Sequence, residues 1–251
     1  MKPTQNLNTL SHSMFDLYDC QNHMTGKDDL MPLFDLADST LRDLGLTALQ
    51  KPTLLPYFYS NESFGGGISL YVLLDFGHFT LHTFSKLKCV FIDLFCAKKI
   101  DIAALTKRLG KEFATSDAIY YQSNRRNNKV LSNSPAANRE KDFGPHYLSF
   151  IKSPLEFKQI YDIVANLPAA AQMTPIMLPA IVETHTSISA LTMIAESHIA
   201  LHYHKPTNEV FLDLFSCKFI PDGIIEKLIE ETINKNAQTH LITRGQKFKN
   251  I

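Results

Sequence analysis

Residues 194–217, IAESHIALHYHKPTNEVFLDLFSC, carry three histidines, a Glu-Ser pair and a cysteine in one short apolar stretch. Such residues suggest either metal binding by the histidines or hydrolysis by a serine or cysteine nucleophile with a histidine base. The stretch alternates apolar and polar residues, which is typical of a strand rather than of a helix. On a strand, His198, His202 and His204 share one face, whereas Ser197 and His198 point to opposite faces.

Neither of these two chemistries is favoured by the spacing. His198 and His202 are four residues apart, as zinc ligands on a helix would be, but the local pattern is that of a strand. No Cys/His pair has the spacing of a structural zinc site, so we expect the histidines to be hydrogen-bonded within a sheet and predict no metal. A Ser–His hydrolase is also disfavoured, because the sequence has no GxSxG motif and Ser197 is adjacent to His198.

An earlier stretch repeats this one. Residues 68–97 align with residues 188–217 without a gap, at an offset of 120, and ten of the 30 aligned positions are identical. The identities include four pairs of polar residues: Ser69/Ser189, His78/His198, His82/His202 and Asp93/Asp213. Two copies are too few for a solenoid, so we interpret the repeat as a tandem duplication of one domain.

The elements around the repeat predict a fold. Alternating segments predict strands at 68–75, 188–195, 197–204 and 209–217, and helical spacing predicts helices at 28–45, 100–113, 153–167 and 220–235. We therefore predict an α+β fold, an α/β/β/α sandwich of two duplicated domains, each an antiparallel sheet with helices on one face. The domains are predicted at residues 1–125 and 143–251, joined by a polar, Asn- and Ser-rich linker at 126–142.

The composition indicates a globular protein of the cytoplasm. It is 45% hydrophobic and 20% charged with a formal net charge of zero, and it gives no indication of binding to nucleic acid or to a membrane surface. No apolar run approaches the roughly 18 residues of a membrane span, and the N-terminus lacks the apolar core of a signal peptide. The four cysteines include no CxxC pair, so we expect reduced thiols.

A further motif lies in the residues beside the histidines. The string Glu196-Ser197-His198, with His202 five residues after the serine and Cys217 twenty after it, resembles the short prokaryotic S-adenosylmethionine decarboxylases. The ending DLFSC at Cys217 is similar to that family, as is the opening HSMFDLYDC at residues 12–20. The resemblance covers both copies of the repeat.

This resemblance implies a proenzyme that makes its own cofactor. The chain would cleave itself between Glu196 and Ser197 and convert Ser197 into a covalent pyruvoyl group. That group would serve as the electron sink for decarboxylation of a small-molecule substrate. Cys217 would be the general acid that protonates the product carbanion. The resemblance also implies that the products, residues 1–196 and 197–251, stay associated.

In the family that it resembles, each site is composite. The nucleophilic serine and the cysteine come from one unit, and a serine and a histidine that assist processing come from the other. The resemblance therefore implies that Ser69 and His82 assist cleavage at the second copy. The reciprocal site would lack both of its groups, because the first copy has Gly77 and Ala97 at those positions. The first copy has lost what only its own site needs and has kept what the surviving site would use.

Substrate recognition departs from the family pattern. An adenine-stacking aromatic residue and a ribose-binding glutamate are replaced by Ser63 and Lys86. Phe64 is a candidate for stacking, and Glu62 is a candidate carboxylate for a distal amine of the substrate. We expect S-adenosylmethionine as the substrate, in polyamine (spermidine) biosynthesis. Two alternatives remain: decarboxylation of a basic amino acid such as ornithine or arginine, and a non-catalytic regulatory homologue.

Overall fold

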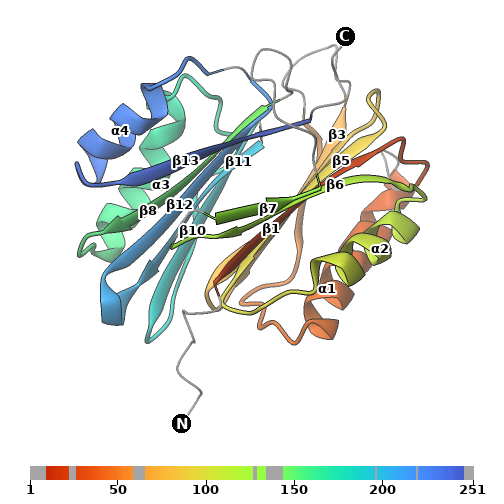
Figure 1. Ribbon diagram of the computed structural model, residues 1–251, viewed down its shortest axis with the longest axis horizontal. Coiled ribbons are helices and arrows are strands. Elements are labelled where there is room, and N and C mark those ends of the chain that lie inside the picture. The colour runs from red at the N-terminus through yellow and green to blue at the C-terminus, as the bar shows by residue number, and fades with distance from the viewer. Residues whose placement is uncertain are drawn as a thin grey trace. The chain divides into compact units, whose positions relative to one another are not determined.

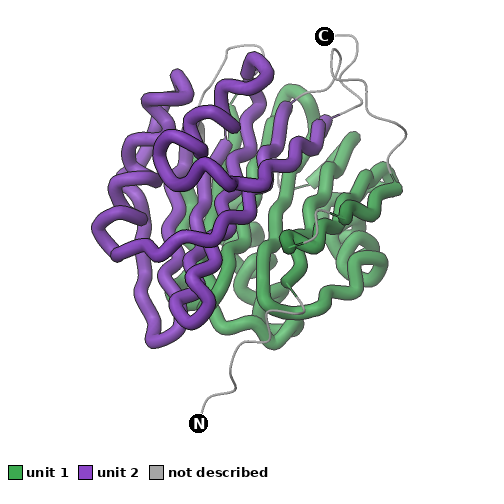
Figure 2. The backbone as a smooth tube through the Cα atoms, turned by 60° about the vertical axis from the view of Figure 1, so that its left-hand side comes forward, with its two compact units in different colours: residues 1–134 green, residues 135–251 purple. Residues whose placement is uncertain are grey.

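The computed structural model describes residues 10–22, 27–58, 66–126, 129–133, 144–195, 197–218 and 220–245. The chain divides into two compact units, residues 1–134 (unit 1) and 135–251 (unit 2), which Figure 2 shows in two colours. Each unit is an antiparallel sheet with α-helices on one face (Figure 1). Among the described residues, no helix combines the length and the apolar character that crossing a membrane requires. The predicted α+β class with two domains is confirmed.

Unit 1 contains a seven-stranded sheet in the order β2-β3-β4-β5-β1-β6-β7. The strands are β1 (Ser11–Tyr18), β2 (Thr53–Phe58), β3 (Gly67–Leu74), β4 (Gly77–Phe84), β5 (Cys89–Cys96), β6 (Asp117–Asn124) and β7 (Lys129–Ser132). The helices are a short 3-10 turn η2 (Lys27–Asp29), α1 (Leu30–Asp43) and α2 (Ile102–Glu112). Strands β3, β4 and β5 follow one another as a meander, whereas β1 pairs with both β5 and β6.

Unit 2 contains a six-stranded sheet in the order β13-β8-β12-β11-β10-β9. The strands are β8 (Gly144–Lys152), β9 (Ala180–Glu183), β10 (Ser187–Ile194), β11 (Ser197–His204), β12 (Glu209–Ser216) and β13 (Gln238–Arg244). The helices are α3 (Phe157–Ala170), α4 (Ile224–Thr232) and the 3-10 turn η3 (Lys205–Thr207) between β11 and β12. The meander β10-β11-β12 repeats that of unit 1, and β8 lies between β12 and β13.

The two faces of each sheet differ in chemistry, because successive side chains of a strand point to opposite faces. On β11, Ile199, Leu201 and Tyr203 belong to the apolar cluster that includes residues of α3 and α4. The alternate residues His198 and His202 therefore lie on the helix-free face. The central strands of unit 1 show the same division. The helix-covered faces form the cores, and the helix-free faces carry the polar residues of the repeat.

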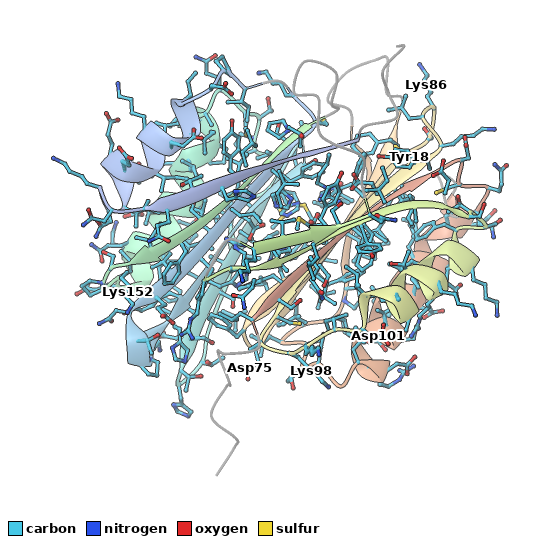
Figure 3. The ribbon with its side chains drawn as sticks, viewed as in Figure 1. Tyr18, Asp75, Lys86, Lys98, Asp101 and Lys152 are labelled. Atoms are coloured by element: carbon cyan, nitrogen blue, oxygen red, sulfur yellow. The ribbon has the colours of Figure 1, made fainter. Side chains whose placement is uncertain are left out.

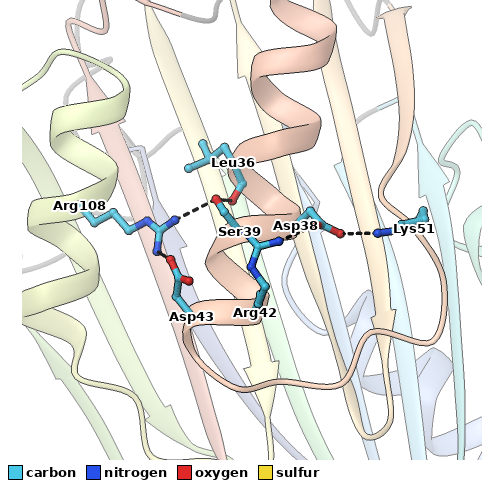
Figure 4. A network of polar contacts seen from close by, with 7 residues as sticks. All are labelled: Leu36, Asp38, Ser39, Arg42, Asp43, Lys51 and Arg108. Atoms are coloured by element: carbon cyan, nitrogen blue, oxygen red, sulfur yellow. Dashed lines mark hydrogen bonds and ion pairs between the residues drawn. The ribbon is translucent and has the colours of Figure 1, made fainter.

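Polar contacts fix α1 and α2 side by side on the sheet of unit 1. Arg108 of α2 donates hydrogen bonds to Asp43 at 2.7 Å and to Ser39 at 2.9 Å, both on α1 (Figure 4). Asp38 of α1 accepts from Lys51 at 2.9 Å, which attaches the chain entering β2. The neighbouring ammonium holds the pKa of the Asp38 carboxyl below its usual range. These exposed pairs orient the helices and add little to the free energy of unfolding.

The predicted helices and strands are present, with ends that differ by a few residues. The predicted linker at 126–142 differs from the structure, because β7 (Lys129–Ser132) pairs with β6 inside it. Residue Leu131 of β7 is 67% exposed. An exposed edge strand has no face to bury, so its polar composition resembles that of a loop.

Candidate active site

Ser197 is the first residue of β11 and is fully buried. Its Oγ has no hydrogen-bond partner among the described residues. Its φ is 151°, a value that residues with a side chain rarely adopt. Backbone strain of this kind costs about 1–3 kcal/mol and collects at functional sites. A buried, unpaired hydroxyl on a strained backbone does not stabilise the fold, so its position favours a chemical role.

The equivalent residue of unit 1, Gly77, has a φ of 127°. A Cβ added there would lie 1.9 Å from the carbonyl oxygen of Phe95 and 3.2 Å from the Cα of Cys96. Atoms that close cannot be accommodated without moving the backbone. Unit 1 therefore lacks both the serine and the space for a side chain at this position.

Cys217 directly follows β12 and is 6% exposed. The preceding residue, Ser216, is the register partner of Ser197. The register therefore places the cysteine one residue away from the position opposite the serine. In unit 1 the equivalent residue is Ala97, and Cys96 belongs to the apolar cluster on the helix-covered face. Burial raises the pKa of the Cys96 thiol to about 11, so Cys96 is a core residue and does not replace Cys217.

Ser69 and His82 are brought together within unit 1. They are register partners on β3 and β4, and Ser69 Oγ is hydrogen-bonded to His82 Nδ1 at 2.9 Å. Both residues are fully buried. Unit 2 holds the same pair, since Ser189 Oγ and His202 Nδ1 are 3.0 Å apart. The serine–histidine pair is thus conserved in geometry between the units, although only unit 2 has a serine at the position of Ser197.

The three histidines of β11 each contact a partner within unit 2. His202 contacts Ser189, and His204 Nδ1 is hydrogen-bonded to Thr207 Oγ1 at 2.8 Å. His198 Nε2 lies 3.3 Å from a carboxylate oxygen of Asp213. The contacts of His202 and His204 are hydrogen bonds, and that of His198 is an ion-pair distance to a carboxylate.

Several residues predicted to form the site cannot be placed. Glu196, Phe64 and Glu62 lie outside the described residues, as does Ser63. Lys86 is described and is exposed in the turn between β4 and β5. Figure 3 shows its side chain at the outer end of this hairpin.

A chain of buried polar side chains in unit 2 was missed by the sequence analysis. Asp213 Oδ2 lies 3.3 Å from His198 Nε2 and 3.8 Å from His146 Nε2. Arg244 Nη1 lies 3.4 Å from His146 Nδ1. All four residues are fully buried. The signal for two of them was present, because His198 and Asp213 recur at the offset of 120 within otherwise apolar strands.

Unit 1 contains the counterpart of this chain. His12 Nε2 lies 3.6 Å from Asp93 Oδ1, and Arg125 Nη1 donates to His12 Nδ1 at 2.9 Å. The ring of His78 packs edge-on to that of His12, with centroids 5.7 Å apart. The arginine lies over the ring of Phe95, as Arg244 lies over the corresponding phenylalanine of unit 2. The two units therefore share this arrangement in addition to the meander.

Comparison with known proteins decides the family. A family model described as S-adenosylmethionine decarboxylase matches residues 11–126 and 155–245, which is most of the chain. The chain belongs to the S-adenosylmethionine decarboxylase family. No curated protein matches the chain significantly. The resemblance read from Ser197, Cys217 and their spacing is confirmed.

Two solved structures are similar at a low level. The adenosylmethionine decarboxylase from Aquifex aeolicus VF5 has 17% identity and a TM-score of 0.36, over 42% of this chain and 92% of that one. An unknown protein from Galdieria sulphuraria has 7% identity and a TM-score of 0.21, over 93% of this chain and 98% of that one.

Membership of the S-adenosylmethionine decarboxylase family indicates a lyase-type decarboxylase that takes a small-molecule substrate. Members generally use a pyruvoyl group. Ser197 suits the formation of such a group, because its hydroxyl is buried, unpaired among the described residues and attached to a strained backbone.

Proposed function

We propose that this chain is a pyruvoyl-dependent S-adenosylmethionine decarboxylase, formed by self-cleavage between Glu196 and Ser197 and acting in spermidine biosynthesis. The observation that carries the proposal is Ser197, whose buried Oγ has no hydrogen-bond partner among the described residues and whose φ is 151°. The same position in unit 1 is a glycine with no room for a side chain. A serine with a strained backbone is thus present in unit 2, where the family's chemistry requires it, and is replaced by glycine in unit 1.

Self-cleavage proceeds in three steps. Ser197 Oγ attacks the carbonyl carbon of Glu196, the C–N bond breaks, and an ester joins the two residues while the nitrogen becomes an amine. Removal of the α-proton of Ser197 then breaks the Cβ–Oγ bond and releases Glu196 as a free carboxylate. The new N-terminus at residue 197 is now an enamine. Water hydrolyses it, which releases ammonia and leaves a pyruvoyl group at this position.

The pyruvoyl group supplies an electron sink for the bond that breaks as carbon dioxide leaves. Cys217 Sγ then delivers a proton to the carbon that lost the carboxylate. The register pair Ser197/Ser216 supports this role, because it places Cys217, the residue after Ser216, near the first residue of β11, which is Ser197. Burial of Cys217 supports it further, since bulk water is kept from the carbanion.

The proposed site is composite. The first domain, at residues 1–125, would donate Ser69 and His82. The second, at residues 143–251, would carry Ser197 and Cys217, with residues 126–142 between the two domains. The helix-free faces of the two sheets would then stack as an α/β/β/α sandwich. The hydrogen bond of 2.9 Å between Ser69 and His82 supports a joint role in processing. Tandem duplication of one domain accounts for the shared meander, Ser–His pair and buried polar chain.

The two products of cleavage would remain associated because they share one sheet. The 1–196 product includes β8, and the 197–251 product includes both neighbours of β8, namely β12 and β13. Strand β10 of the large product also pairs with β11 of the small one. Separation would break the backbone hydrogen bonds on both sides of β8. We therefore expect the products to co-elute on size exclusion until urea unfolds the sheet.

A second substrate class is favoured by one observation. Lys86 stands where the family has its ribose-binding carboxylate, and an ammonium cannot accept hydrogen bonds from two ribose hydroxyls. Its exposed side chain lies at the outer end of the β4–β5 hairpin (Figure 3). Loss of the nucleoside contact would be tolerated by a decarboxylase of ornithine or arginine. Release of labelled carbon dioxide from S-adenosylmethionine, ornithine and arginine, measured in parallel, distinguishes the substrates.

The first test of the proposal is the covalent state of the purified chain. Intact mass and a denaturing gel are expected to show residues 1–196 and a fragment 197–251 with a blocked N-terminus. Ser197→Ala is expected to abolish cleavage, and Ser216→Ala, at the register partner, is the matched control that should still cleave. A wild-type chain that stays whole on long incubation would refute the enzyme and favour the non-catalytic regulatory homologue.

A further inference from the structure

The buried polar chain of unit 2 ends beside Ser197. It takes one side chain from each of four neighbouring strands: Arg244 from β13, His146 from β8, Asp213 from β12 and His198 from β11. The ring of His146 packs on Phe215 with centroids 5.4 Å apart, and the guanidinium carbon of Arg244 lies 4.4 Å from the centroid of the same ring. His198 directly follows Ser197 in the sequence, so the chain of contacts reaches the residue next to the cleavage point.

The contact with Arg244 fixes the first acceptor along this series of side chains. Arg244 can only donate, so the Nδ1 atom of His146, 3.4 Å from Arg244 Nη1, is the acceptor. The other ring nitrogen, His146 Nε2, lies 3.8 Å from Asp213 Oδ2. The same oxygen lies 3.3 Å from His198 Nε2. Arg244 and Asp213 carry opposite charges on either side of His146, which lowers the cost of burying both.

The position of Ser197 requires such a restraint. A residue with a side chain keeps a φ of 151° only where its surroundings over-determine the backbone. His198 provides the restraint, because its backbone is paired with Met193 on one side and Phe215 on the other. Its ring Nε2 also lies at ion-pair distance, 3.3 Å, from Asp213 Oδ2. Fixing residue 198 restricts how residue 197 can rotate. The backbone of Ser197 is thereby restrained from the side of residue 198.

We propose that Arg244, His146, Asp213 and His198 are positioning residues for self-cleavage, which hold the backbone at Ser197 in the conformation from which its hydroxyl attacks. This inference rests on the proposed self-cleavage at Ser197. It adds residues that act through the backbone rather than on the reacting atoms.

Unit 1 provides an internal control. Its chain of Arg125, His12 and Asp93 has the same residue types, with distances of 2.9 Å and 3.6 Å. His78 occupies the position of His198, but the residue before it is Gly77, which has no hydroxyl to orient. The buried polar side chains can stabilise both units, whereas only those of unit 2 can contribute to cleavage.

The test compares Asp213→Asn with Asp93→Asn. Each variant is synthesised in a cell-free system, and the fragment 197–251 is followed by mass spectrometry over time. Both substitutions are expected to lower the thermal midpoint by similar amounts, since each removes a buried carboxylate that is paired with a buried histidine. Only Asp213→Asn is expected to slow cleavage, by at least about tenfold. Hydroxylamine, which cleaves esters, should not accelerate its cleavage, because the step that is lost precedes the ester.

Three results would overturn the inference while the proposed function stands. These are cleavage of Asp213→Asn at the wild-type rate, equal slowing by Asp93→Asn, and accumulation of a hydroxylamine-sensitive chain. If Asp213→Asn does not fold, His198→Gln and His78→Gln make the same comparison with the charges left in place. A wild-type chain that never cleaves would instead refute the proposed function, and the inference with it.

Discussion

Replacing Gly77 by alanine tests whether unit 1 has lost the space for a side chain as well as the serine. The added Cβ would lie 1.9 Å from the carbonyl oxygen of Phe95 and 2.7 Å from its carbonyl carbon, at a φ of 127°. The positive φ costs about 1–2 kcal/mol for a residue with a side chain. Moving β5 away from the new methyl group costs about 1–3 kcal/mol more, which is the typical cost of overpacking a core.

Gly223→Ala is the matched control. Gly223 has a φ of 81°, and an added Cβ there would have no atom within 4 Å, so the control carries the backbone cost alone. Urea unfolding of both variants is expected to show that Gly77→Ala is the more destabilising by about 1–3 kcal/mol. Equal destabilisation would refute the steric argument. In the double variant Gly77→Ser with Ala97→Cys, intact mass should show no break before residue 77, because the restored serine does not fit.

Three further outcomes are expected. Ser69→Ala and Ser189→Ala each remove one serine–histidine hydrogen bond, of 2.9 Å and 3.0 Å, but only the first should slow self-cleavage; equal slowing would contradict the composite site. Cys217→Ala should cleave normally and lose about 10²–10⁴-fold in carbon dioxide release, and normal turnover would assign the proton to another group. Burial raises the pKa of Cys96 from 9.0 to about 11, so the folded state holds a proton that the unfolded state loses. The free energy of unfolding should therefore be highest below pH 9 and fall as the pH rises toward 11, less steeply in Cys96→Ala, which urea midpoints across that range will check.

The meanders and the helices were predictable because their signals are local. The alternation in 197–204 and the helical spacing in 100–113 each lie within a dozen or so residues of sequence. The repeat at an offset of 120 then marked Ser69 and His82 as residues retained without a nucleophile in their own copy. These inferences needed no knowledge of how the strands pair.

The flanking strands were not predicted, because they join the sheets through long-range pairing. Strand β1 carries His12 and Asp16 among its apolar residues, and both are fully buried. Buried polar residues of this kind break the simple alternation from which a half-buried strand is recognised. Strand β8 enters between β12 and β13 from far along the chain. No local pattern indicates such an insertion.

The sequence by itself determined the residue types of the chemistry: a serine after a glutamate, a cysteine twenty residues later, and a degenerate copy with Gly77 and Ala97 at the same positions. Only the tertiary structure decided the state of those residues. The strain at Ser197 and the exclusion of a side chain at residue 77 depend on the neighbouring strands. The contact between Arg244 and His146 joins positions 98 residues apart. Such features arise from packing, and packing is fixed only when the whole sheet has formed.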